Sequence, residues 1–146
     1  MKFFAVYLAL CLVLSPSLTN AEDLDLDVET KLPKEIIKSW ENLMVSNMEH
    51  CIAESGIDPK RVLDIFGKMD MSIGHLDCFA ECHYKKLGFM DSDHKFLPKL
   101  MAEKISGLTE DIAKHCTSKY KNEENVCNKV LSVVKCNINN IAKQYN

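Results

Sequence analysis

The stretch CFAECHYKKLGFMD, residues 78–91, places two cysteines four positions apart and a histidine directly after the second. Thiolates and imidazoles are common zinc ligands, and a cysteine beside a histidine can also act as a nucleophile with its base. The same cysteines could instead form disulfides with other segments of the chain. Their CxxxC spacing differs from the CxxC of thioredoxin-like motifs, so it does not support a redox site.

The first 21 residues indicate the compartment in which these cysteines lie. They comprise Lys2, a run of twelve apolar residues and a small, polar end around Thr19 and Ala21, which is the pattern of a secretory signal peptide. We therefore expect a secreted, extracellular protein with a single domain over residues 22–146. No later run approaches the ~20 apolar residues that a membrane-spanning helix requires, so we expect no stable membrane insertion.

Six cysteines remain after residue 21, and an even number in an exported chain predicts three disulfides. In a helix, Cys78 and Cys82 share a face with Cβ atoms ~6 Å apart, whereas a disulfide requires ~3.8 Å. Cys127 and Cys136, nine positions apart, would lie on opposite sides of a helix. Excluding these two local bonds removes five of the 15 pairings that six cysteines allow and leaves ten.

A zinc site is the competing interpretation, built from His75, Cys78 and Cys82 or from Cys82 and His83. Thiolate metal sites favour reducing compartments, and every cysteine after residue 21 has a potential partner. We therefore expect disulfides, and neither a metal nor another cofactor.

Helices are the elements that must position these residues. After Pro33, apolar residues recur every three or four positions along most of the chain. Residues 22–32 are strongly acidic at their start and are expected to form a flexible leader. No useful strand-like alternation occurs, so the sequence predicts an all-α fold of about six short helices. Prolines, capping residues and glycines place them over about residues 33–54, 59–67, 74–87, 98–107, 109–116 and 122–145.

Composition and motifs exclude several function classes. Residues 22–146 carry 17 basic and 21 acidic side chains, a net charge of −4, whereas nucleic-acid-binding proteins present clustered basic surface. The chain contains no GxSxG, HExxH or phosphate-binding glycine loop. Tyr84 follows His83, where secreted phospholipases place an aspartate. We therefore expect neither nucleic-acid binding nor enzymatic activity.

The cysteine spacing and the KLGFMD segment resemble a known family. Between successive cysteines after residue 21 lie 26, 3, 33, 10 and 8 residues. Over about residues 33–141, this is similar to the insect odorant-binding proteins, the six-cysteine family that includes the pheromone-binding and general odorant-binding proteins. The resemblance implies helices around a hydrophobic cavity, stapled by the disulfides Cys51–Cys82, Cys78–Cys127 and Cys116–Cys136.

The resemblance also implies a secreted carrier. Such a protein binds odorants or pheromones in its cavity and delivers them through sensillar lymph to olfactory receptors; we expect a monomer or a weak homodimer. A carrier of non-olfactory lipids or hormones in another secretion is one alternative. The other is a saposin-like membrane-active protein, which would cluster its cysteines at both chain ends and present a basic amphipathic surface.

A mid-sized apolar ligand with one polar group would suit such a cavity. Burying ten methylenes at ~0.8 kcal/mol each contributes ~8 kcal/mol before the cost of association is subtracted. We expect about half of the candidate wall residues to be ordinary core instead. These candidates are Trp40, Leu43, Met44, Met48, Phe66, Leu76, Phe79, Tyr84, Phe89, Phe96, Leu100, Met101, Ile112, Val130, Val134 and Ile138.

Two tyrosines are candidates for the ligand's polar end. Tyr84 is the first choice, because its hydroxyl can meet a polar group inside an apolar wall. Tyr145 is the second, because the resemblance implies that a short tail after Cys136 acts as a lid or wall. Histidines could tune ligand release in acid, although we expect most of them to be solvated. They are His50, His75, His83, His94 and His115.

Overall fold

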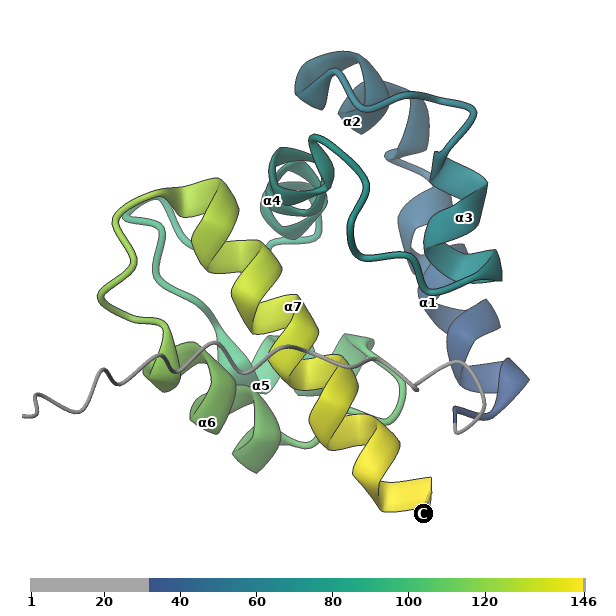
Figure 1. Ribbon diagram of the computed structural model, residues 1–146. Coiled ribbons are helices and arrows are strands. Elements are labelled where there is room, and N and C mark those ends of the chain that lie inside the picture. Colours follow the sequence, from purple (N-terminus) through teal and green to yellow (C-terminus); the bar gives the residue numbers. More distant parts are fainter. Residues whose placement is uncertain (1–31, 146) are drawn as a thin grey trace, which may run out of the picture.

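The computed structural model describes residues 32–145 of the chain, and in this range it is helical. Within these residues the only extended pairing is an isolated bridge between Met90 and Phe96. The predicted all-α fold class is confirmed. The helices are α1 Lys34–Val45, α2 Met48–Ser55, α3 Val62–Gly67, α4 Leu76–Lys86, α5 Pro98–Lys104, α6 Glu110–Lys119 and α7 Val126–Ala142, with the 3₁₀ helix η2 Lys143–Tyr145 after them (Figure 1).

The predicted signal peptide, residues 1–21, lies outside the described residues. So does the predicted leader, residues 22–32, except for its last residue. That residue, Leu32, is buried in the core. No helix in the described part of the chain is both long enough and apolar enough to cross a bilayer.

Capping residues set several helix boundaries where the sequence places them. Thr109 Oγ1 accepts a hydrogen bond from the Ile112 amide at 3.2 Å and begins α6. Pro98 occupies the first turn of α5, where its missing N–H leaves no hydrogen bond unmade.

The start of α7 differs from the prediction by four residues, because Asn125, rather than Asn122, is its cap. The Asn125 Oδ1 accepts a hydrogen bond from the Asn128 amide at 2.9 Å.

The predicted helix over residues 33–54 is divided in two at Ser46 and Asn47. The Asn47 amide donates to the Met44 carbonyl at 3.1 Å, a tighter turn than that of an α-helix. Serine and asparagine favour such breaks because their side chains compete for backbone hydrogen bonds. The break redirects α2 toward α4, so that Cys51 reaches Cys82 (Figure 1).

Three disulfides connect the helices, and they are the three pairs that the resemblance implies. Cys51–Cys82 joins α2 to α4, Cys78–Cys127 joins α4 to α7, and Cys116–Cys136 joins α6 to α7. A chain-entropy argument gives roughly 3 to 4 kcal/mol of stabilisation for each loop. α4 is therefore held covalently on two sides.

The core has two groups of buried side chains. The first surrounds α7 and includes Phe89, Met101, Val130, Val133 and Ile141. The second lies among α2, α3 and α4 and includes Ile57, Ile65 and Phe79. Phe66 and Met71 are half-buried and pack against both groups. In Figure 1, α4 and α7 accordingly lie between α1–α3 on one side and α5–α6 on the other.

Candidate functional site

An apolar cavity of about 110 Å³ lies where the two core groups meet. It is smaller than the roughly 300–1,000 Å³ of typical ligand pockets, so a ligand of ten carbons requires its walls to move. Its walls come mainly from α1, α3, α4, α7 and the loop after α3. They are formed by Trp40, Leu43, Met44, Ile65, Phe66, Met69, Met71, Leu76, Phe79, Ala80, His83, Tyr84, Leu87, Phe89, Ile105, Leu131, Val134, Asn137, Ile138 and Ile141.

Helical periodicity explains which faces of α4 and α7 form the wall. The α4 residues on the cavity follow a spacing of three or four from Leu76 to Leu87, and those of α7 do so from Leu131 to Ile141. Cys78 and Cys82 lie between the wall positions of α4 and bond to α7 and α2. Side chains that face a cavity make fewer packing contacts than those in a filled core, and the two disulfides hold the α4 wall in place despite this loss.

Trp40 connects α1 to the turn between α5 and α6. The ring is buried in the wall, and its Nε1 donates to the Ser106 carbonyl at 2.9 Å. The Ser39 and Ser106 hydroxyl oxygens lie 2.6 Å apart and share a second hydrogen bond. Both contacts fix the rotation of α1 that turns Trp40 inward.

The loop after α3 contributes two methionines to the wall, Met69 and Met71. Met69 is buried with φ of 51°, a left-handed conformation that is uncommon for residues other than glycine. The Asp70 amide donates to the Asp64 carbonyl at 3.2 Å, which closes the loop onto α3. Because methionine side chains are flexible, this part of the wall can change shape around a ligand.

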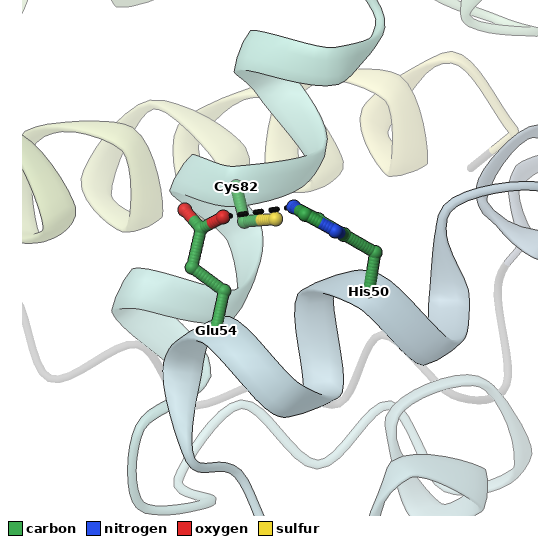
Figure 2. Close-up of side chains that lie close together, drawn as sticks. All are labelled: His50, Glu54 and Cys82. Carbon is green, nitrogen blue, oxygen red and sulfur yellow. Dashed lines mark hydrogen bonds and ion pairs between the residues drawn. The ribbon is translucent and has the colours of Figure 1, made fainter.

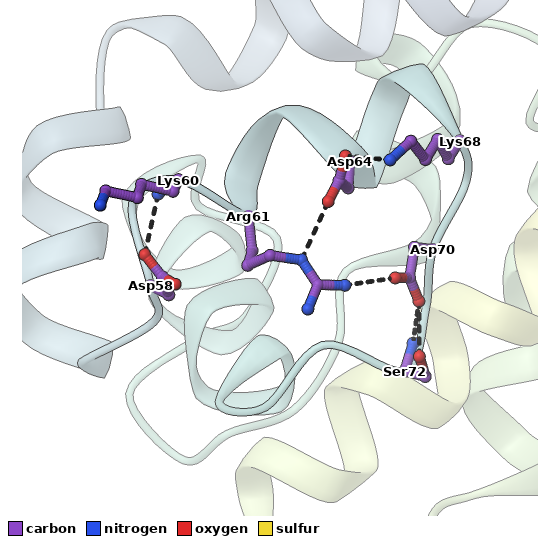
Figure 3. Close-up of polar contacts among 7 residues, drawn as sticks. All are labelled: Asp58, Lys60, Arg61, Asp64, Lys68, Asp70 and Ser72. Carbon is purple, nitrogen blue, oxygen red and sulfur yellow. Dashed lines mark hydrogen bonds and ion pairs between the residues drawn. The ribbon is translucent and has the colours of Figure 1, made fainter.

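A surface network, which we call the Arg61 network, fastens the same loop (Figure 3). Arg61 Nε lies 2.9 Å from Asp64 Oδ2, and Arg61 Nη2 lies 2.8 Å from Asp70 Oδ2. Asp70 Oδ1 also accepts from the Ser72 hydroxyl at 2.6 Å and from its amide at 2.9 Å. Lys68 Nζ lies 3.0 Å from Asp64 Oδ1.

These hydrogen bonds favour the ionised carboxylates. The one from Lys68 and then the one from Arg61 lower the pKa of Asp64, while those from the Ser72 hydroxyl and amide lower the pKa of Asp70. The side chains of the Arg61 network reach solvent and pair with one another, so the network holds the loop that carries Met69 and Met71.

A groove on the outer surface adjoins the cavity between α1 and α3. Phe66 and Met69 line both the groove and the cavity, so their side chains separate the two spaces. Leu32, Ile37 and the exposed Leu63 contribute further apolar surface. Charged side chains from α1, Lys34, Lys38 and Glu41, complete the groove.

The cavity brings together ten of the residues expected to form its wall. They are Trp40, Leu43, Met44, Phe66, Leu76, Phe79, Tyr84, Phe89, Val134 and Ile138. The structure places the other seven outside the wall. Met101 and Val130 are fully buried in the core, and Tyr145 on η2 is 45% exposed. The remaining four are only partly buried. Those four are Met48, Phe96, Leu100 and Ile112.

The end of the tail, η2, does not reach the cavity, whereas Asn137, Ile138 and Ile141 earlier in the tail line it. Gln144 Nε2 donates to the Gly107 carbonyl at 2.9 Å, so η2 packs on the turn between α5 and α6. Gly107 has φ of 81°, and a Cβ there would lie 2.9 Å from Ile141 Cγ2. The close approach of α7 to this turn therefore requires glycine.

Ten wall residues were not among the sequence candidates. Leu87, Leu131 and Ile141 continue faces of α4 and α7 that periodicity already identified, whereas Met69 and Met71 lie in a loop without such a signal. His83 was missed because histidines are usually solvated. The remainder are Ile65, Ala80, Ile105 and Asn137.

Three wall residues are polar: His83, Tyr84 and Asn137. His83 is 1% exposed, whereas the four other histidines are exposed. Burial lowers the pKa of His83 to about 4, so its imidazole is neutral at pH 7. Burial also raises the pKa of Tyr84 above its ordinary value, so this hydroxyl keeps its proton. The Tyr84 ring packs edge-on against Phe89 and Phe96, with centroids 5.3 Å and 6.2 Å away.

The exposed His50 and Glu54 and the buried Cys82 form a cluster that superficially resembles a metal site (Figure 2). His50 and Glu54 are one helical turn apart on the exposed face of α2, and the distance from His50 Nε2 to Glu54 Oε2 is 2.9 Å. The Cys82 sulfur is bonded to Cys51 and is therefore not a thiolate. The zinc sites considered from the sequence lose their thiolates in the same way, because Cys78 is also paired.

Comparison with known proteins gives a family. The model of the PBP/GOBP family matches residues 34–140, which include all six paired cysteines and every wall residue except Ile141. No curated protein and no solved structure matches the chain significantly. The family is one of soluble, secreted carriers of small hydrophobic ligands rather than of enzymes, which favours a carrier over the saposin-like alternative. This chain belongs to the PBP/GOBP family, the insect odorant- and pheromone-binding proteins.

Proposed function

We propose that this protein is a secreted carrier that takes a small hydrophobic odorant or pheromone into the cavity and delivers it through aqueous fluid to an olfactory receptor. The observation that carries the proposal is an apolar cavity at the junction of two core groups, in a chain of a hydrophobic-ligand-binding family. The cavity wall is built from helices that disulfides hold in place, so its shape does not depend on a filled core.

The expected ligand follows from the wall chemistry. Seventeen of the twenty wall residues are apolar, so affinity comes mainly from burying hydrocarbon. Micromolar binding requires about 8 kcal/mol net, which a mid-sized chain or ring system with a few polar contacts can supply. Movement of Met44, Met69 and Met71 can widen the cavity.

Ligand access is proposed through the groove between α1 and α3. Phe66 and Met69 form the barrier there, and neither is fixed by a hydrogen bond from its side chain. Replacing Phe66 by alanine should raise both the association and the dissociation rates of a ligand in stopped-flow fluorescence. Unchanged rates would place the access route elsewhere.

Secretion and assembly are part of the same proposal. Residues 1–21 act as a cleaved signal peptide and residues 22–32 as a leader to the helical domain, which works without a cofactor as a monomer or a weak homodimer. Mass spectrometry of the protein secreted by insect cells tests the cleavage site. Analytical ultracentrifugation tests the assembly.

Binding is tested by titrating the oxidised protein with the fluorophore N-phenyl-1-naphthylamine and displacing it with alcohols, esters, aldehydes and terpenoids. Ala80 lies on the wall of α4, and Ala80→Phe should fill the cavity and abolish binding. Ala53→Phe is the matched control, because Ala53 is exposed on α2 and its substitution should leave binding intact. Circular dichroism verifies that both variants fold. Equal binding by both variants would contradict a ligand in this cavity.

A further inference from the structure

Two polar side chains of the cavity wall make no hydrogen bond of ordinary length to any described residue. They are His83, at both imidazole nitrogens, and Asn137, at both the carboxamide nitrogen and oxygen. The side chains are almost completely buried, with residue exposures of 1% and 4%. Buried polar groups in native proteins are nearly always paired, and an unpaired one destabilises the fold. Such residues in a cavity wall are candidates for contact with a ligand.

The two residues lie on the helices that form the main walls, His83 on α4 and Asn137 on α7. Tyr84 follows His83 in α4. Burial raises the pKa of the Tyr84 hydroxyl, and a long, weak hydrogen bond with the Asn137 carboxamide lowers it by less. The remaining wall residues are apolar, and no wall residue in the described part of the chain is Lys, Arg, Asp or Glu. The wall thus has three neutral polar side chains, which we call the polar region of the cavity, and is otherwise apolar.

The chemistry of these groups indicates which ligand they suit. A neutral imidazole offers one N–H donor and one acceptor nitrogen, and a carboxamide offers two donors and one acceptor. A hydroxyl group can donate to one of them and accept from the other. An ether or ester can only accept, and a carboxylate would bring a charge into a cavity whose wall offers no cation.

Building on the proposed carrier function, we propose that the cavity selects ligands with a terminal hydroxyl, held between His83 and Asn137 with its hydrocarbon chain along the apolar wall. Binding such a ligand gives each side chain one of the hydrogen bonds that it lacks in the protein alone. The ligand class is therefore a medium-chain or terpenoid alcohol rather than the corresponding ester, acid or hydrocarbon.

The test compares 1-octanol, 1-methoxyheptane and nonane, which have the same number of non-hydrogen atoms. Affinities are measured for the wild type, His83→Leu and Asn137→Leu by displacement of N-phenyl-1-naphthylamine. Each leucine variant should weaken octanol binding about tenfold relative to nonane, the effect of one lost hydrogen bond. Val134→Ala, on the apolar wall one turn before Asn137, should weaken all three ligands by the same factor.

The outcomes separate this inference from the carrier function. If the folded wild type binds none of the three ligands, the carrier function fails. If it binds nonane and octanol but the leucine variants change both affinities equally, only the hydroxyl selection is overturned. Should a variant not fold, ¹⁵N NMR of the wild-type His83 ring gives the answer: octanol should shift its resonances much more than nonane does, and equal shifts would overturn the proposal.

Discussion

The Arg61 network and the polar region of the cavity differ in how their hydrogen bonds are satisfied. In the network, Arg61, Asp64 and Asp70 are solvent-accessible and paired with one another or with neighbours. In the cavity, the side chains of His83 and Asn137 are buried and make no hydrogen bond of ordinary length to the described residues. Paired surface groups stabilise the loop that they join. Buried groups without hydrogen bonds lower the stability of the fold unless a ligand provides the missing bonds. The comparison separates residues that serve the fold from residues that serve binding.

The largest effect should follow from removing the cross-link between the two helices that carry His83 and Asn137. Cys78→Ala with Cys127→Ala eliminates the disulfide between α4 and α7 and leaves the Arg61 network intact. The free energy of unfolding should fall by about 4 kcal/mol, since the bond closes a loop of 49 residues. Denaturation by guanidinium chloride measures this loss. An unchanged midpoint would show that packing alone holds α4 against α7.

Acid should affect the two regions in different pH ranges. The His83 pKa is about 4 in the folded protein and 6.5 when unfolded, so between these values the unfolded chain binds the proton and stability falls as the pH falls. The total loss is about 3 kcal/mol at ~1.4 kcal/mol per pH unit. Asp64 and Asp70 have lowered pKa values, so their stabilisation is present above pH 3.8 and is lost below it.

The measurement is the difference in unfolding free energy between the wild type and His83→Leu from pH 7 to pH 4. Between pH 7 and pH 4, the leucine variant should not show the decrease in unfolding free energy that His83 causes in the wild type. Parallel curves for the two proteins would mean that His83 is not held neutral by burial.

Asparagines on α7 give a matched pair for the next effect. Asn137→Leu removes unpaired polar atoms from the wall and should stabilise the ligand-free protein by about 1 kcal/mol. Asn140→Leu should destabilise it by a similar ~1 kcal/mol, because Asn140 Nδ2 donates to the Cys136 carbonyl at 2.8 Å. Thermal unfolding of both variants measures the effects. Destabilisation by both would indicate that Asn137 is paired in solution.

The smallest effect is expected at the Arg61 network. Arg61→Gln should lower the melting temperature slightly at low salt and less at high salt, because exposed ion pairs are weak and screened. Octanol affinity should change much less than in Asn137→Leu, since Arg61 lies outside the cavity wall. A loss of affinity equal to that of Asn137→Leu would mean that the loop after α3 controls binding.

Sequence reasoning was most successful where local chemistry decides structure. Pro98 and Thr109 mark the starts of α5 and α6, and Gly88, with φ of 73°, has the left-handed conformation that commonly follows a helix C-terminus. The break at Ser46 and Asn47 was missed because apolar periodicity continues across it. The disulfide pairs came from the family resemblance, since geometry alone left ten possibilities.

The site was less predictable because periodicity identifies a buried face without saying what the face contacts. Val130 and Val134 share one face of α7, yet only Val134 reaches the cavity. Met69 entered the wall through a loop held by tertiary contacts, which no local pattern encodes. His83 differs from the exposed histidines only in the packing of α4 against its neighbours.

The most direct test of the account is a crystal structure of the oxidised protein with 1-octanol. We predict density for the alkyl chain between α4 and α7, against Phe79 and Ile138, with the hydroxyl within hydrogen-bonding distance of His83 and Asn137. Octanol bound only on the outer surface, with no density for it inside the cavity, would contradict the account.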